Sequence, residues 1–219
     1  VPVRARLRVA VLSTGDELRE VGQDAGSGQI FDANRPMLLS LATRWGFEPV
    51  DLGRVGDDRN VLRAVFDEGA ARADVILTSG GASAGDEDHV SALLRATGAL
   101  QMWRFALKPG RPLALAMWQG VPVFGLPGNP VAALVCALVF ARPAMAALSA
   151  QGGIDPQGYA LPAGFEKQKK PGRHEYLRAR VRDGRVEAFA SEGSGRISGL
   201  SWAEGLVELD SAASHIRSG

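Results

Sequence analysis

The chain has 219 residues, of which 46% are apolar and 22% carry charge, and its formal net charge is +1 at pH 7. This balance is ordinary for a globular protein and excludes an intrinsically disordered chain. A net charge so close to zero offers no general attraction to nucleic acid or to a membrane surface, so we expect neither as a partner. The single cysteine, Cys136, excludes a disulfide within the chain and any cluster of thiolate metal ligands.

No apolar run reaches the length that we expect of a membrane span, and the first residues enter a strand without a signal-peptide pattern. These features predict a cytoplasmic protein.

Strand-like and helix-like segments alternate along the first two thirds of the chain. Continuous apolar runs predict strands at residues 7–13, 50–55, 74–79, 112–118 and 121–127. Apolar residues at helical spacing predict helices at residues 34–45, 59–71 and 86–97, and a further helix that begins at Pro130. This alternation predicts a doubly wound α/β structure with a mostly parallel sheet over residues 1–149. Short alternating runs separated by glycines then predict a small, barrel-like all-β domain over residues 150–219.

Acidic residues follow the first three predicted strands. They are Asp16 and Glu17, then Asp57 and Asp58, then Asp86, Glu87 and Asp88. Because the carboxyl ends of parallel strands meet at one edge of an open sheet, we expect these side chains to share a neighbourhood. A single acidic loop is an ordinary helix cap, but clustered carboxylates without cysteine or histidine partners suit a hard cation, above all Mg²⁺.

The third of these loops, SGGASAGDEDHV, is rich in glycine and serine ahead of its acids. Backbone N–H groups in such a loop can converge on one anion next to a helix N-terminus. It is not a Walker loop, because it lacks the Gly-Lys-Ser/Thr ending. Two more loops, WRFALKPGRP and GLPGNP, add cationic side chains and free backbone donors at strand ends. Together these loops predict a site for Mg²⁺ and a phosphate group.

A series of motifs occurs in the order and spacing of the MoeA family, the molybdopterin molybdenumtransferases, to which the gephyrin E domain also belongs. These motifs are STGDEL, IFDANRPML, GDD, SGGASAGDEDHV, KPGRP and GLPGNPVAAL. The segments GRHEYLRARV and EGSGRISGL resemble the C-terminal β domain of that family, so the resemblance covers essentially the whole chain. Family members carry two N-terminal domains before the first motif, and we expect this sequence to be the catalytic and C-terminal portions of a larger protein.

The resemblance implies Mg²⁺-dependent insertion of molybdate into adenylylated molybdopterin, with release of AMP. It implies that Glu17, Asp57 and Asp88 are catalytic and hold the metal, and that Lys108 is catalytic. The residues implied to bind the substrates are Thr14, Gly15, Ser79, Gly80, Gly81, Ser83, Gly85, Arg104, Arg111, Pro127, Gly128, Asn129, Arg173, Ser194 and Ser198. The roles of Asp16, Asp58 and Asp86 stay open. The family further implies a homodimer of the full-length protein, with contacts to the adenylating MogA-type protein and to recipient molybdoenzymes.

Other functions remain open on the sequence. Gephyrin shows that this fold can serve as a scaffold, and a catalytically incomplete fragment could act as a binding or scaffold module; the intact acids argue against scaffolding alone. A molybdopterin-binding module of the MogA or CinA type shares the glycine-rich core, although the GLPGNP loop and the β domain favour MoeA. A Mg²⁺-dependent nucleotide pyrophosphate hydrolase would act on an adenylate without a pterin, such as ADP-ribose.

Overall fold

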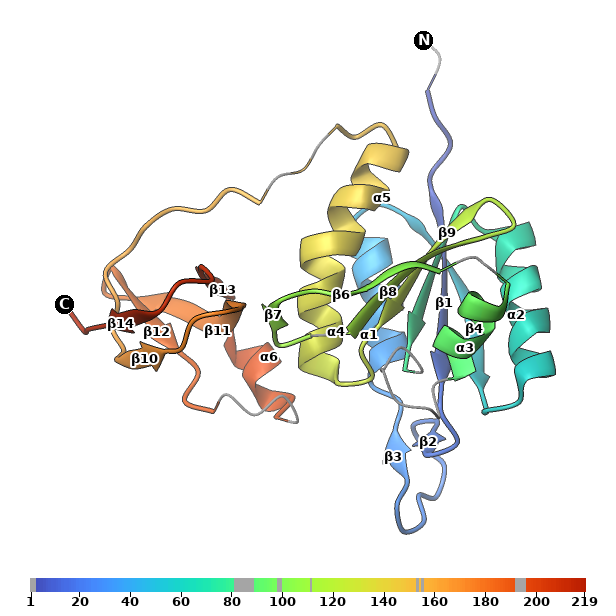
Figure 1. Cartoon of the computed structure of the whole chain (residues 1–219), viewed down its shortest axis with the longest axis horizontal. Coiled ribbons are helices and arrows are strands. Elements are labelled where there is room, and N and C mark those ends of the chain that lie inside the picture. Colours follow the sequence, from blue (N-terminus) through green and yellow to red (C-terminus); the bar gives the residue numbers. More distant parts are fainter. Residues whose placement is uncertain are drawn as a thin grey trace.

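The structure is a computed structural model that describes residues 3–80, 89–97, 100–110, 112–152, 154, 156–191 and 196–219. An α/β layer structure is followed by a smaller region of short strands (Figure 1). The predicted fold class, an α/β fold with a mostly parallel sheet and a C-terminal β region, is confirmed.

A six-stranded sheet in the order β4-β1-β5-β9-β8-β6 forms the middle layer. Its strands are β1 (Arg8–Thr14), β4 (Glu48–Val55), β5 (Val75–Ser79), β6 (Leu100–Arg104), β8 (Pro112–Trp118) and β9 (Val121–Leu126). The strands β4, β1, β5 and β9 run parallel, whereas β8 is antiparallel to both β9 and β6. The predicted turn between β8 and β9 is tight, because Gln119 and Gly120 adopt the positive φ angles, 48° and 82°, that a two-residue hairpin turn requires.

Helices cover both faces of this sheet (Figure 1). They are α1 (Asn34–Arg44), α2 (Arg59–Arg72) and α3 (His89–Ala96), then α4 (Pro130–Cys136), the π-helical segment η1 (Ala137–Ala141) and α5 (Arg142–Leu148). Val9 and Val11 of β1 pack with α1, α4, η1 and α5, while Ala10 and Leu12 pack with α2 and α3. All four side chains are fully buried, so β1 has apolar contacts on both faces, as its continuous apolar sequence predicts.

The segment Pro130–Leu148 corrects one expectation. It is 19 residues long with a mean hydropathy of 2.1, so by length and composition it is apolar enough to cross a membrane. Half of it is buried inside the fold, where Cys136, Ala141 and Met145 pack against the sheet. Packing in the core therefore accounts for its apolar composition.

The C-terminal region consists of short strands and one helix. These are β10 (Lys167–Lys169), β11 (His174–Arg182), β12 (Arg185–Ala188), α6 (Ser198–Trp202), β13 (Gly205–Leu209) and β14 (Ser214–Ile216). The strands β12, β11 and β13 pair in that order, and β10 pairs with β14. The all-β expectation is wrong for the five residues of α6, because a helix this short has too few turns to leave a periodic pattern in the sequence.

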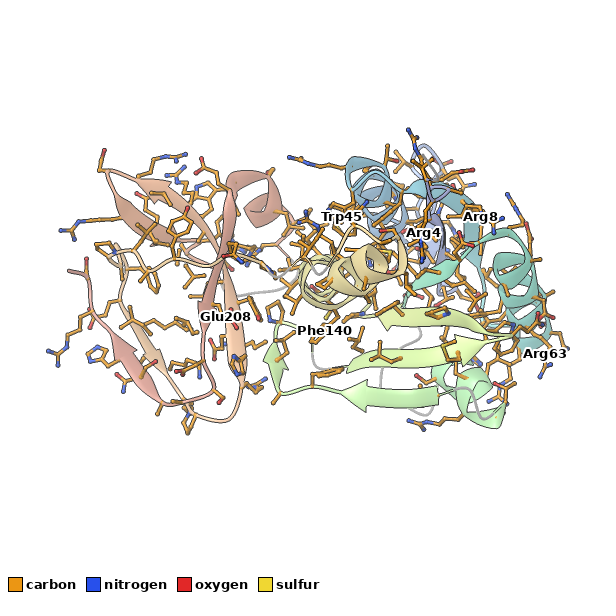
Figure 2. All side chains as sticks on the ribbon, turned by 90° about the horizontal axis from the view of Figure 1, so that it is seen from above. Arg4, Arg8, Trp45, Arg63, Phe140 and Glu208 are labelled. Carbon is orange, nitrogen blue, oxygen red and sulfur yellow. The ribbon has the colours of Figure 1, made fainter. Side chains whose placement is uncertain are left out.

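A small strand from the α/β part joins the C-terminal region. The strand β7 (Leu107–Lys108) pairs with β11, and the amide of His174 donates to the carbonyl oxygen of Ala106 at 2.9 Å. Tyr176 and Leu206 pack against the core of the α/β part. In Figure 2, Glu208 lies in the C-terminal region and Phe140 on the neighbouring side of the α/β layers, with Arg63 at the far edge. We call the pairing of β7 with β11, together with the packing of Tyr176 and Leu206, the β7–β11 joint.

Candidate functional site

The sheet has a topological switch point between β1 and β5. From β1 the chain passes through α1 to β4 on one side, and then through α2 to β5 on the other side of β1. Ser13 and Ser79 are register partners at the carboxyl ends of these two strands. Ligands of doubly wound sheets bind in the crevice outside the carboxyl ends of the strands at such a point.

Backbone packing at this point is very close. Gly80 has a φ of 85°, and a Cβ there would overlap the carbonyl oxygen of Thr14. A Cβ on Gly128, in the loop between β9 and α4, would lie 3.6 Å from the Cα of Gly80. Three strand ends therefore meet here with little side-chain bulk between them.

The loop after β9 is held by the cap of α4. Asn129 is the N-cap residue, and its Oδ1 accepts from the amides of Val131 at 3.1 Å and Ala132 at 3.3 Å. Pro130 occupies the first helical position, as its fixed φ and missing N–H favour. The structure thus brings together these predicted binding residues: Thr14, Gly15, Ser79, Gly80, Pro127, Gly128 and Asn129.

Two of the three acidic loops are in contact. The amide of Gly15 donates to the carbonyl of Val55 at 3.2 Å, and the amide of Asp57 donates to Oδ1 of Asp16 at 3.3 Å. Glu17 and Asp57 are both exposed at this contact. The structure therefore gives Asp16 the role of joining the loop after β1 to the loop after β4.

Asp58 has a different role from its neighbour Asp57. It is the N-cap of α2, and its Oδ1 accepts from the amides of Asn60 at 2.8 Å and Val61 at 3.1 Å. The hydrogen bonds from Val61 and Asn60 hold the pKa of this carboxyl below its ordinary value. Asp58 is thus occupied in capping a helix.

Several predicted residues lie outside the described residues. They are Gly81, Ser83, Gly85, Asp86, Asp88, Arg111 and Ser194. Within the described ranges, no group of three or more His, Cys, Asp or Glu side chains could hold a metal ion. Glu17 and Asp57 are therefore the described members of the predicted metal set, and their donors are all carboxylate oxygens.

Two of the predicted cationic residues, Lys108 and Arg173, lie at the β7–β11 joint. The Nζ of Lys108 lies 3.6 Å from Oε2 of Glu175, and the Nζ of Lys167 lies 3.3 Å from the same oxygen. Arg173 is half-buried and directly precedes His174, which pairs with Leu107. Arg104, of which only the backbone is described, ends β6. Lys108, on β7, and Arg173, directly before β11, are thus a second group of predicted residues.

Ser198 is exposed at the start of α6, two residues after Arg196, whose carbonyl accepts a hydrogen bond from Arg178. Nη1 of Arg178 donates to the carbonyl of Arg196 at 2.7 Å, and Nη2 donates to the carbonyl of Ser191. These two carbonyls flank residues 192–195. Burial lowers the pKa of Arg178 below its ordinary value. The role of Arg178 could not be predicted, because an arginine that binds backbone carbonyls leaves no motif in the sequence.

Sequence reasoning also missed the contacts of Asp32, Asn34 and Arg35 at the start of α1. Asp32 and Asn34 are buried, and Asn34 Nδ2 donates to Oγ of Ser79 at 2.6 Å and to the carbonyl of Gly128 at 2.7 Å. The motif IFDANRPML contributes to the family resemblance, but the contacts of Asn34 involve residues far away in the chain. The N-cap position of α1 is Ala33, which makes no side-chain capping bond, while Oδ1 of Asp32 accepts from the amide of Arg35 at 3.1 Å.

Two family models match the chain. The model described as a probable molybdopterin binding domain matches residues 10–147, and the model described as the MoeA C-terminal region (domain IV) matches residues 160–219. The chain belongs to the MoeA family. It carries the switch-point site in the first of these matched regions and Arg173 and Ser198 in the second.

Curated relatives agree with this membership. A molybdopterin molybdenumtransferase of Haemophilus influenzae is 38% identical over 174 residues, which cover 79% of this chain and 43% of that protein. A molybdopterin molybdenumtransferase of Nostoc sp. is 34% identical over 229 residues, which cover 100% of this chain and 52% of that protein. The chain thus spans about half the length of these relatives.

A solved structure of a molybdopterin biosynthesis MoeA protein from Pyrococcus horikoshii superposes with a TM-score of 0.84 at 26% identity. The match covers 98% of this chain and 52% of that one. The resemblance to the MoeA family seen in the motifs is therefore confirmed by sequence and by fold.

Proposed function

We propose that this chain acts in molybdenum cofactor synthesis as a molybdopterin molybdotransferase, which inserts molybdate into adenylylated molybdopterin and releases AMP. The observation that carries the proposal is the meeting of Thr14, Gly80 and Gly128 at the switch point of the sheet. The relatives named molybdopterin molybdenumtransferase support the same reaction.

The adenylate occupies the switch point in this proposal. Gly80 has no side chain to obstruct the approach of a phosphate, and the positive φ of this residue turns the backbone at the end of β5. Thr14, Gly15 and Ser79 lie on the β1 and β5 side of the same point, and Pro127, Gly128 and Asn129 lie on the β9 side. Gly81, Ser83 and Gly85 continue the loop after β5 and complete the binding set.

Mg²⁺ is held by Glu17, Asp57 and Asp88 in this proposal. The described residues fit such an ion, because Mg²⁺ in proteins takes oxygen donors, commonly one or two carboxylates together with substrate phosphates and water. Glu17 and Asp57 provide two exposed carboxylates on loops that the Asp16 contact holds together. When bound, the ion supplies a positive charge that polarises a phosphoryl oxygen.

Lys108 binds the oxyanion substrate or the phosphate, assisted by Arg104 and Arg111. Arg173, Ser194 and Ser198 contribute from the C-terminal region. The β7–β11 joint supports this assignment, because it brings Lys108 and Arg173 to the same pair of strands.

The domain organisation and the assembly that we propose are those of the MoeA family. We propose that the chain divides after residue 149 into an α/β domain and a C-terminal β domain, and that the full-length protein is a cytoplasmic homodimer. Its partners are the adenylating MogA-type protein and the recipient molybdoenzymes.

Release of AMP from adenylylated molybdopterin tests the function. The expected result is release that requires both molybdate and Mg²⁺. The variant Glu17→Gln should lower the rate about 100-fold or more, because a carboxylate of the metal set is lost. Glu68→Gln is the matched control, since Glu68 is half-exposed on α2 and pairs with Arg72.

Two outcomes would contradict this function. Tight binding of the adenylate without release would favour a binding or scaffold module. Hydrolysis of ADP-ribose at a similar rate would favour a general nucleotide pyrophosphatase.

A further inference from the structure

We propose that residues 32–35 (DANR) form a clamp that ties together the four parallel strands of the sheet, and that Asn34 within it is a positioning residue for the adenylate loops. This inference rests on the proposed function, because the loops that Asn34 joins are those assigned to the adenylate. We call residues 32–35 the α1 clamp.

The first anchor of the α1 clamp is Asp32, which is 3% exposed. Its Oδ1 accepts from Oγ of Ser13 at 3.1 Å, near the end of β1. The same oxygen accepts from the amide of Arg35 at 3.1 Å, so Asp32 also caps the first turn of α1. Asp32 therefore fixes the start of α1 against β1.

The second anchor of the α1 clamp is Arg35, which follows Asn34 in the chain, whereas Asp32 precedes it. Its Nη1 lies 2.6 Å from Oδ2 of Asp51 on β4, and its Nη2 pairs with the carboxylate of Glu20 after β2 (Leu18–Arg19). Its Nε lies 3.3 Å from Oδ2 of Asp32. The planar guanidinium of Arg35 has several donors in a fixed geometry, which suits contacts with three carboxylates. The compact ammonium group of a lysine would not reproduce these contacts.

Asn34 is held between these anchors and connects the other two strands. It donates to Oγ of Ser79 at the end of β5 and to the carbonyl of Gly128 after β9. The Gly128 carbonyl can only accept, so the nitrogen of the amide must face it. Asn34 thus sets the separation between Gly80, which follows Ser79, and the loop that contains Gly128.

The remaining oxygen of Asn34 indicates that stability alone does not account for this residue. Asn34 Oδ1 is buried and has no hydrogen-bond partner among the residues that the structure describes, and the same holds for Oγ1 of Thr14. An unsatisfied buried acceptor costs free energy. The side chain also makes no capping bond for its own helix, since the N-cap position is Ala33. A free-energy cost of this kind is expected for a residue that positions a functional site.

The test compares Asn34→Asp with the parent chain. Aspartate keeps the size of the side chain but places an oxygen against the Gly128 carbonyl, where two acceptors repel. We expect the Kd for adenylylated molybdopterin, measured by titration calorimetry at a temperature where the variant is fully folded, to rise at least about tenfold. The KM for the adenylate should rise in parallel, while the molybdate concentration at half-saturation stays within about twofold. A purely structural role would lower the unfolding temperature without moving the affinity of the folded protein.

Asn60→Asp is the matched control, because Asn60 is exposed in the first turn of α2. It should bind as the parent does. If Asn34→Asp does not fold, Asn34→Ala removes both donations and should also weaken binding. Unchanged affinity of Asn34→Asp or, in its absence, of Asn34→Ala, beside a parent that binds, overturns this inference alone. A parent that does not bind the adenylate overturns the proposed function itself.

Discussion

Glu175 is a nearly buried carboxylate at the β7–β11 joint. It is 6% exposed, and Oε2 lies between the ammonium groups of Lys108 and Lys167. Neither contact has hydrogen-bond geometry, so the interaction is an attraction between charges. Removing this carboxylate would take away a negative charge that both lysines share.

Glu175→Gln should therefore destabilise the chain by about 1–3 kcal/mol, because Lys108 and Lys167 lose the nearly buried negative charge that they share. Urea unfolding measures the change in midpoint. Glu187→Gln is the control, since the Glu187 side chain is 42% exposed and its pair with Arg180 should contribute less than about 1 kcal/mol. Equal midpoints for both variants would show that Glu175 has no special role at the joint.

Cys136 is a buried thiol, and its burial raises the pKa to about 12. The thiolate is the reactive form, so the native protein at pH 8 should not react with a thiol reagent such as DTNB. Labelling should begin only at urea concentrations that unfold the chain. Rapid labelling without urea would mean that the segment between α4 and η1 opens in the native state.

At the scale of elements, Gly80 shows how backbone approach constrains the site. Its φ of 85° disfavours any side chain, and a Cβ would also overlap the Thr14 carbonyl. Gly46, after α1, has a nearly identical φ of 84° but nothing within 4 Å of its Cβ position. Comparing substitutions at the two glycines therefore distinguishes the free-energy cost of backbone strain from that of close packing.

Gly80→Ala should destabilise the chain by more than Gly46→Ala, which should cost about 1 kcal/mol from strain alone. Thermal unfolding of both variants measures the difference. Gly80→Ala should also weaken adenylate binding, whereas Gly46→Ala should not. The close packing inferred between β5 and β1 would be contradicted by equal losses of stability.

The long elements of the α/β part were predictable from the sequence because each contains several turns or pleats of apolar residues. The helices at Asn34–Arg44 and Arg59–Arg72 and the hairpin of β8 and β9 agree with the predicted ranges to within a few residues. The elements β2, β3 (Ile30–Phe31) and β7 were not predicted, since two residues carry no periodicity. The strand β6 overlaps the predicted loop WRFALKPGRP, and its apolar run is too short to predict a strand.

The site was predictable in part for a related reason. The glycines and acids that follow strands mark the edge where they meet, and the contact between the loops of Asp16 and Asp57 agrees with that expectation. The contacts of Asn34 and Glu175 depend on residues far away in the chain, Gly128 and Lys108, so no local pattern contains them.

At the scale of the whole molecule, the two matched regions are connected by residues 148–159 and by the β7–β11 joint. The connecting segment has exposed side chains, Tyr159 at 77% among them. Limited proteolysis should cut first within residues 150–166, and the two fragments should stay associated through β7, Tyr176 and Leu206. Fragments that separate at once on a sizing column would show that the joint does not hold the two parts together.

The central claim is that the switch point between β1 and β5 binds the adenylate. The most direct test is a crystal structure of the chain with AMP and Mg²⁺. The account predicts the nucleotide phosphate against the backbone of Gly80, between Thr14 and Gly128. A phosphate bound elsewhere, or no bound nucleotide at saturating AMP, would contradict it.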